Sequence, residues 1–212
     1  IKHEVITVNE IDFLIRSLID RQQFSDDDQR AEALGISSAT WALFGVVWPT
    51  SRVLASTVSI INLDGKRVHE IGCGLALTSI VLHKMGIDIT ASDYHPMARE
   101  FLDKNILANE LTPIKFQTGN WETENPLLGK FDLIIGSDVL YEPAHAEQVS
   151  QFINSHSGND VDVIIVDPGR GNRSNFTKKM TALGYTNTFD RFDVPDGEHK
   201  RCKGRVLHYH RH

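Results

Sequence analysis

The stretch Val68-His-Glu-Ile-Gly-Cys-Gly-Leu-Ala-Leu77, followed by Ile89-Thr-Ala-Ser-Asp93, carries the strongest structural signal in this chain. An apolar strand ends in an acidic residue and a glycine-rich turn, a helix follows, and a second strand ends in aspartate. Glycine suits such a turn because a Cβ would block close approach of the backbone to a ligand. Nucleotide-type ligands bind at the carboxyl ends of parallel strands. The stretch therefore predicts such a site, with Gly72 and Gly74 against the ligand and Asp93 accepting hydrogen bonds from ribose hydroxyls.

The residues around the turn favour one nucleotide over another. The dinucleotide fingerprint G-x-G-x-x-G/A requires a third small residue, and Leu77 stands in its place. The acid Glu70 would repel a pyrophosphate but suits a cation. S-adenosylmethionine carries a sulfonium and an ammonium and no phosphate, so we predict S-adenosylmethionine and not NAD. An ordinary strand–turn–helix with two chance glycines stays open at this point.

Length and cysteine content bound the class of protein. A chain of 212 residues fits one α/β domain with an N-terminal elaboration. We expect residues 1–60 to form an extension packed on a core of residues 61–212. The two cysteines, Cys73 and Cys202, argue against a disulfide framework and predict a reducing compartment, the cytoplasm. Neither a long apolar run nor a signal peptide is evident, so we expect no membrane association.

The net charge of −6 argues against a general nucleic-acid binder. The charge is uneven, because residues 1–168 carry 12 Lys/Arg against 24 Asp/Glu and residues 169–212 carry 10 against 4. This pattern fits either a solvated mixed surface or a basic rim that attracts an acidic partner.

Periodicity predicts the elements along the chain. Residues 3–8 predict a short strand, and apolar residues at helical spacing predict a helix over residues 9–19. A further short helix is expected over 28–34, and another helix begins at Pro49. From residue 67 strand and helix patterns alternate, which is typical of a doubly wound parallel sheet. The expected strands are 67–72, 87–92, 114–118, 131–137, 161–166, 185–192 and 205–210, and the expected helices are 75–85, 96–109, 143–155 and 172–183. The fold class is therefore α/β, a mostly parallel, seven-stranded, Rossmann-like sheet with an antiparallel edge strand and an N-terminal helical extension.

Four further motifs accompany the glycine turn. They are Phe44-Gly-Val-Val-Trp-Pro-Thr-Ser-Arg-Val-Leu-Ala55, Asn120-Trp121, Ser137-Asp-Val-Leu-Tyr-Glu142 and Asp167-Pro-Gly-Arg170. In this order the set resembles the seven-strand S-adenosylmethionine-dependent methyltransferases. It is most similar to the protein-lysine methyltransferase branch that includes the enzymes for calmodulin, cytosolic chaperones and electron-transfer flavoprotein β subunit. The resemblance covers roughly residues 44–212, and the Asp-x-x-Tyr motif is specific to the branch.

The resemblance implies an enzyme that transfers a methyl group from S-adenosyl-L-methionine to a lysine of a protein substrate, leaving S-adenosyl-L-homocysteine. It implies catalytic roles for Asp138 and Tyr141, and substrate contact for Arg170, which can instead pair with Asp167. The implied cofactor-binding residues are Trp48, Glu70, Gly72, Gly74, Asp93, Asn120, Trp121 and Ser137. Two residues depart from the branch pattern, since Ala76 replaces a third glycine and Asn120 replaces an aspartate. Asn120 can still meet the adenine amino group through its side-chain oxygen.

Each assignment has a plainer alternative. Asp138 and Asp93 can be helix caps, and Trp48, Trp121 and Tyr141 can be packing residues. The chain can also be a small-molecule methyltransferase, or a binding module without turnover, because one fold hosts many functions. His208, His210 and His212 alternate and share one face of an expected edge strand. No acid or cysteine completes a site there in the sequence, so we predict no metal.

Overall fold

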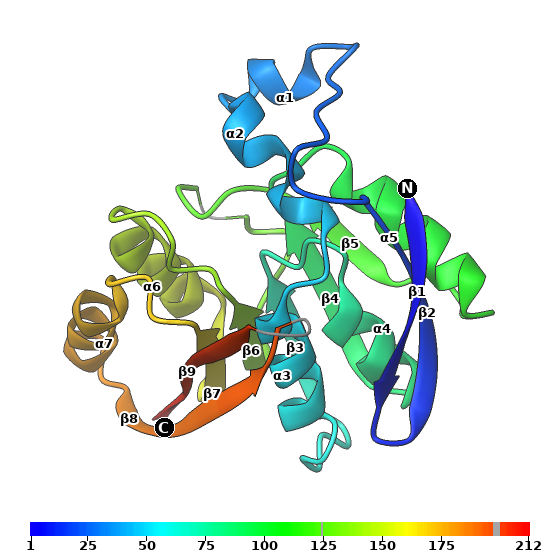
Figure 1. Ribbon diagram of the computed structural model, residues 1–212. Coiled ribbons are helices and arrows are strands. Elements are labelled where there is room, and N and C mark those ends of the chain that lie inside the picture. Colours follow the sequence, from blue (N-terminus) through cyan, green and yellow to red (C-terminus); the bar gives the residue numbers. More distant parts are fainter. Residues whose placement is uncertain (124, 197–199) are drawn as a thin grey trace.

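A computed structural model describes residues 1–123, 125–196 and 200–212 of the chain. Its centre is a seven-stranded sheet with the order β5-β4-β3-β6-β7-β9-β8 (Figure 1). The first five strands in this order run parallel, and β9 is antiparallel to both of its neighbours. These strands are β3 (Arg67–Ile71), β4 (Asp88–Asp93), β5 (Lys115–Thr118), β6 (Phe131–Ser137), β7 (Ser157–Asp167), β8 (Thr186–Pro195) and β9 (Arg201–Arg211). The predicted α/β class and mostly parallel sheet are confirmed.

Helices cover both faces of the sheet because the central strands are apolar on both sides. On β6, Leu133 and Ile135 belong to one buried cluster and Ile134 to the other. The first cluster packs under α3 (Pro49–Val58), α4 (Leu77–Lys84) and α5 (Ala98–Ala108), and the second packs under α6 (His145–His156) and α7 (Arg173–Ala182). The two groups of helices lie on opposite sides of the sheet in Figure 1.

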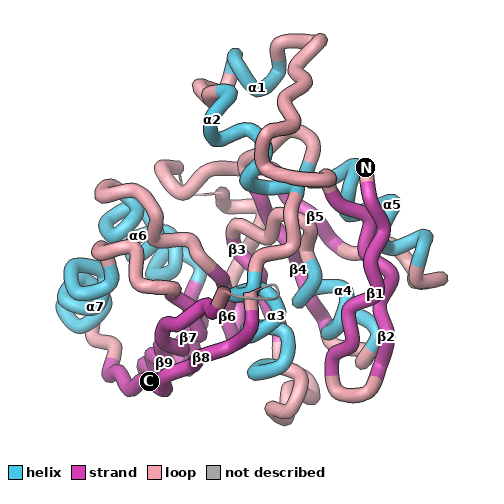
Figure 2. The backbone as a smooth tube through the Cα atoms, viewed as in Figure 1, coloured by secondary structure: helices cyan, strands magenta, loops and turns pink. Residues whose placement is uncertain are grey.

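The N-terminal segment differs from the prediction. The helix expected over residues 9–19 is wrong, because β1 (Lys2–Val8) and β2 (Ile11–Ser17) form an antiparallel hairpin (Figure 2). Phe13, Ile15 and Ser17 are buried while Asp12 and Leu14 are exposed, so burial over residues 12–17 follows the period of two of a strand. Only short helices follow, α1 (Arg30–Ala33), α2 (Ser38–Trp41) and the 3₁₀ turn η1 (Ala42–Gly45).

The side-chain amides of Asn105 in α5 and of Asn109, the residue after α5, hold the hairpin in place. The Asn109 amide accepts a hydrogen bond from the Leu14 N–H and donates one to the Leu14 carbonyl, at 2.9 and 2.8 Å. Asn105 accepts one from the Arg16 N–H at 2.7 Å. These bonds satisfy backbone groups at the edge of β2, which would otherwise need water or another strand.

The order of the last two strands in the sheet also differs from the prediction. The edge strand of this end is β8, and β9 lies between β7 and β8. His208 and His210 therefore lie on a strand with a paired neighbour on each side, not on an edge strand, and His212 follows the end of β9. Among the described residues, no helix is both long and apolar enough to cross a membrane.

Candidate active site

The carboxyl ends of β3, β4 and β6 open into one cavity of about 580 Å³. The strand order reverses at β3, between β4 and β6, and this is where doubly wound sheets bind ligands. The structure brings ten of the eleven predicted site residues to the wall of this cavity. They are Trp48, Gly72, Gly74, Asp93, Asn120, Trp121, Ser137, Asp138, Tyr141 and Arg170.

The glycine turn lines the cavity floor with bare backbone. Gly72 and Gly74 have φ of +56° and +53°, in the left-handed region that favours glycine. A Cβ on Gly72 would lie 3.0 Å from the Trp121 ring, and one on Gly74 would lie 2.8 Å from the Phe44 carbonyl oxygen. Ala76 is also left-handed, at φ +57°, but it is fully buried and does not line the cavity. Its methyl group therefore leaves the ligand space unchanged.

Asp93 ends β4 beside this turn. Its carboxylate accepts hydrogen bonds from the Gly74 N–H at 2.7 Å and the His95 N–H at 2.8 Å. Burial raises the pKa of this carboxyl, and the backbone donors act in the opposite direction. Each oxygen accepts one of these bonds and has a second lone pair, so the carboxylate can also accept hydrogen bonds from a ligand.

Glu70 is the exception among the predicted residues, because its carboxylate does not line the cavity. It is 2% exposed and accepts hydrogen bonds from the N–H and hydroxyl of Ser79, in the first turn of α4. A carboxylate suits this place because the first N–H groups of a helix have no partner within the helix. Burial raises the pKa of Glu70 to about 7. The expected contact with a cationic ligand is therefore corrected to a contact that anchors the helix after the glycine turn.

Asp138 lies at the end of β6 and is held by Arg170. The guanidinium donates two hydrogen bonds to the carboxylate, from Nε at 3.0 Å and from Nη2 at 2.6 Å. Asp138 has φ +53°, and its N–H donates to the Val166 carbonyl at 2.8 Å. The alternative pairing of Arg170 with Asp167 is wrong, because Arg173 is the residue that pairs with Asp167, at 3.3 Å.

An aromatic group stands beside Asp138. The ring of His145 packs edge-to-face against both Tyr141 and Trp121, with centroids 4.4 and 5.0 Å apart. Burial lowers the pKa of His145 and raises the pKa of Tyr141 to about 12. Tyr141 therefore keeps its proton at neutral pH and acts as a donor or a ring surface, not as a base. His145 was not among the predicted site residues, although it lies only four residues after Tyr141, at the start of α6.

Trp48 and Asn120 both line the cavity. The Trp48 indole donates to the Leu43 carbonyl at 2.9 Å, and the Arg170 guanidinium lies 5.9 Å from its ring centroid. The side-chain oxygen of Asn120 accepts hydrogen bonds from the Glu122 N–H at 3.2 Å and from the Thr123 hydroxyl at 3.1 Å, in a local turn. Both lone pairs of the oxygen that was expected to meet an adenine amino group are therefore used within the chain.

One wall of the cavity comes from a segment without clear periodicity. Phe44 stacks on His95 with ring centroids 3.8 Å apart, and Trp41 meets His95 edge-on. Phe44 and His95 line the cavity but were not among the predicted residues. Their sequence signals were weak, since Phe44 is the first residue of a quoted motif and His95 lies two residues after Asp93.

The cavity and its residues can be compared with known proteins. A sequence model described as lysine methyltransferase matches residues 32–182. The chain belongs to the lysine methyltransferase family. The match includes β3 to α7 and thus the whole glycine turn, Asp138 and Arg170, whereas the β1–β2 hairpin and the β8–β9 pair lie outside it. The resemblance noted from the motifs is confirmed at this level.

Curated relatives carry names that specify different acceptor residues. The chain is 31% identical over 148 residues to the electron transfer flavoprotein beta subunit lysine methyltransferase of Rattus norvegicus, covering 67% of this chain and 55% of that protein. It is 30% identical over 139 residues to protein N-lysine methyltransferase METTL21A of Danio rerio, covering 60% and 63%. A histidine protein methyltransferase 1 homolog of Dictyostelium discoideum matches at 34% over 101 residues, covering 45% and 33%. The matches thus span less than two thirds of each of these relatives.

Solved structures share the fold. A methyltransferase from Pyrococcus furiosus superposes with a TM-score of 0.63 at 18% identity, covering 87% of this chain and 98% of that one. A magnesium protoporphyrin IX methyltransferase from Synechocystis, solved with S-adenosylmethionine, gives 0.58 at 20% identity, covering 77% and 78%. These likenesses confirm the Rossmann-like methyltransferase architecture.

Proposed function

We propose that this protein transfers a methyl group from S-adenosyl-L-methionine to the side-chain amine of a lysine in a protein substrate. The observation that carries the proposal is the placement of Asp138 and Tyr141, at the end of β6, on the same cavity as the glycine turn and Asp93. Membership of the lysine methyltransferase family supports it. The product of the cofactor is S-adenosyl-L-homocysteine.

The cavity suits this cofactor on structural grounds. Gly72 and Gly74 leave backbone exposed where a Cβ would collide with the wall, so the chain can lie directly against a ligand. Asp93 would hold the ribose hydroxyls. Trp48, Asn120, Trp121 and Ser137 would contact the methionine and adenine ends. Glu70 would contribute through α4, which it anchors next to the turn. When bound, the cofactor supplies an electrophilic methyl group on a cationic sulfur.

The protein must present a neutral amine in line with that methyl group. A free lysine has a pKa of about 10.4, so deprotonation at pH 7 costs ~4–5 kcal/mol. The guanidinium of Arg170 lies beside the place where the amine would enter, and a nearby cation lowers an amine pKa. Asp138 would accept a hydrogen bond from the amine and align it, and the departing proton would pass to water. Positioning of this kind is the main catalytic contribution required for a displacement.

The exposure of the residues at the rim of the cavity favours a side chain that reaches inward from a large substrate. Tyr141 is 43% exposed and the Arg170 side chain is 44% exposed, whereas the Asp138 side chain is only 11% exposed. A lysine is long enough to pass an exposed rim and place its amine at a recessed carboxylate. The Tyr141 ring would contact a methylated ammonium by a cation–π interaction.

The proposal also covers the cellular compartment of the reaction and the kind of partner. Both described cysteines are free, and Cys73 is buried beside the glycine turn. A reducing compartment suits them, and we propose the cytoplasm. The acidic net charge favours a protein partner over a nucleic acid.

Labelled S-adenosylmethionine provides the test. Purified protein is incubated with it and a fractionated cell lysate, and labelled species are digested and located by mass spectrometry. The expected result is a label on the lysine of a protein, absent with Asp138→Asn. Label confined to small molecules, or to histidine or arginine, would contradict the lysine acceptor.

A further inference from the structure

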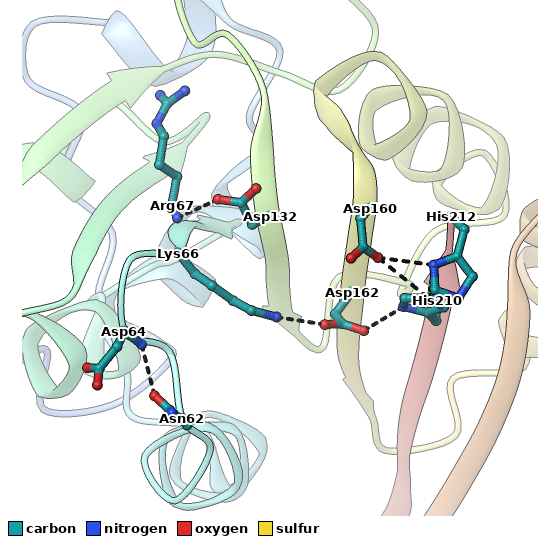
Figure 3. Close-up of polar contacts among 9 residues, drawn as sticks. All are labelled: Asn62, Asp64, Lys66, Arg67, Asp132, Asp160, Asp162, His210 and His212. Atoms are coloured by element: carbon teal, nitrogen blue, oxygen red, sulfur yellow. Dashed lines mark hydrogen bonds and ion pairs between the residues drawn. The ribbon is translucent and has the colours of Figure 1, made fainter.

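A second cluster of reactive side chains lies at the other end of the sheet. Asp160 and Asp162 lie near the amino end of β7, and His210 and His212 lie at the end of β9 (Figure 3). The antiparallel register pairs Asp162 with His210. Alternate residues of a strand share a face, so the two strands place both carboxylates and both imidazoles on one side. The active-site cavity, in contrast, is lined by Asp138 and its neighbours at the carboxyl ends of the strands.

Three atoms of this cluster form a nearly regular triangle. His210 Nε2 lies 3.2 Å from His212 Nδ1 and 3.6 Å from Asp160 Oδ1. The third side, from His212 Nδ1 to Asp160 Oδ1, is 3.4 Å. A tetrahedral zinc site with bonds of about 2.0–2.1 Å separates its ligand atoms by roughly 3.4 Å. The three atoms therefore already have the spacing of one face of a zinc tetrahedron.

The next layer of contacts orients His210 as a metal ligand. Its other ring nitrogen, Nδ1, is 2.9 Å from Asp162 Oδ1. The second oxygen of Asp162 accepts a hydrogen bond from the Lys66 ammonium at 3.0 Å. In metal sites a carboxylate characteristically holds the non-ligating nitrogen of a histidine, which fixes the ring and directs Nε2 outward. Figure 3 shows this chain of contacts from Lys66 through Asp162 to His210.

We propose that Asp160, His210 and His212 bind a divalent transition-metal ion, with zinc as the preferred ion. Asp162 holds His210, and water completes the tetrahedron. This corrects the expectation that no acid accompanies the late histidines, because Asp160 is distant in sequence and reaches them only through strand pairing. Asp160 and His212 are 77% and 86% exposed, so an ion has an open path to the site. Bound metal would tie β7 to the end of β9 and raise stability.

The ion itself is the probe. The full chain is freed of metal and titrated with Zn²⁺ by calorimetry, and with Co²⁺ by visible absorption, which reports tetrahedral nitrogen–oxygen coordination. We expect one ion per chain and a rise in the unfolding temperature with zinc. His212→Ala and Asp160→Asn should each weaken zinc binding at least 10-fold. Asp162→Asn should weaken it by about 10–100-fold, the usual effect of losing such a supporting carboxylate.

The matched control is His3→Ala, which removes an exposed imidazole from β1 and should bind zinc like the wild type. His212 is so exposed that its replacement leaves the fold intact, which the unfolding temperature of the metal-free variant will check. The proposal is overturned by wild-type protein that takes up no zinc at micromolar concentration. It is equally overturned by zinc binding that His212→Ala and Asp160→Asn leave unchanged.

Discussion

Arg170 and Asp138 form a two-point ion pair across the ends of β7 and β6, with hydrogen bonds of 3.0 and 2.6 Å. A guanidinium matches a carboxylate in this planar arrangement better than an ammonium does. Parallel pairing of the two strands brings the motifs that follow them together. The pair gives the carboxylate a fixed orientation and places a positive charge next to it. Both properties enter the proposed reaction, so each partner can be tested separately.

Asp138→Asn tests the carboxylate. The variant should bind S-adenosylmethionine as the wild type does but lose methyl transfer by about 10²–10³-fold, the usual effect of removing one precisely placed electrostatic group. Calorimetry measures the first quantity and a labelled-methyl assay the second. Asp132→Asn, at the other end of β6, is the control and should keep full activity. A fully active Asp138→Asn enzyme would show that the lysine mechanism is wrong.

Arg170→Gln tests the positive charge. Because a nearby cation lowers the pKa of the acceptor amine, the variant should show a methyl-transfer pH profile moved upward by about one unit. Its rate at pH 7 should fall roughly 10-fold and recover at high pH. Arg170→Lys should restore the pH profile but not the orientation of Asp138. A rate reduced equally at every pH would assign Arg170 to structure alone.

Sequence reasoning located most of the fold and of the site because the informative patterns are local. The strand–turn–helix around Gly72 and the acids after β4 and β6 were predicted from a few neighbouring residues. The parallel order of the strands then brought Asp93 and Asp138 to one cavity, as such sheets do.

The misses arose where tertiary contacts decided the outcome. The segment 9–19 has apolar residues at helical spacing, but its backbone is held as a strand by the hairpin and by the side chains of Asn105 and Asn109, in and just after α5. The sequence offered Asp167, three residues away, as the partner of Arg170, and only the parallel pairing of β6 with β7 reveals that Asp138 is the partner. Asp160 is about 50 residues from His210, so only the register of β7 on β9 reveals that they meet.

Asp93→Ala tests the ribose assignment. Loss of charged hydrogen bonds to two hydroxyls should weaken S-adenosylmethionine binding by about 10–100-fold. Asp93 also holds the Gly74 and His95 N–H groups, so urea unfolding is measured in parallel to confirm that the variant folds. Asp88→Ala, at the start of the same strand, is the control. Unchanged affinity in calorimetry would remove Asp93 from the ribose site.

Gly74→Ala tests the glycine turn. An added Cβ would lie 2.8 Å from the Phe44 carbonyl oxygen, at a φ of +53°. We expect the free energy of unfolding to fall by ~3 kcal/mol or more, from left-handed strain of about 1–2 kcal/mol plus the collision. Gly86→Ala is the matched control, because its φ is +83° and nothing lies within 4 Å of the added Cβ. Its free energy of unfolding should fall only by the contribution of the left-handed strain. Equal losses in urea unfolding would mean that Phe44 moves aside freely.

Glu70 gives a pH dependence whose sign follows from its burial. The pKa of this carboxyl rises from 4.5 to about 7 in the folded protein. Below pH 4.5 both the folded and the unfolded chain hold the proton. Between pH 4.5 and 7 only the folded chain keeps it, so the free energy of unfolding falls as the pH rises. Above pH 7 the loss is complete and amounts to ~3 kcal/mol.

Glu70→Gln removes this titration while keeping a side-chain oxygen for the Ser79 donors. The free energy of unfolding of the wild type, minus that of the variant, should therefore fall by roughly 2–3 kcal/mol between pH 5 and pH 8. Taking this difference cancels the other carboxylates, which titrate in both proteins. Glu32→Gln, on the exposed face of α1, is the control for the removal of one carboxylate. A constant difference for Glu70→Gln in urea unfolding would mean that the carboxylate is ionised at its ordinary pKa. The N–H groups of α4 would then hold it as an anion.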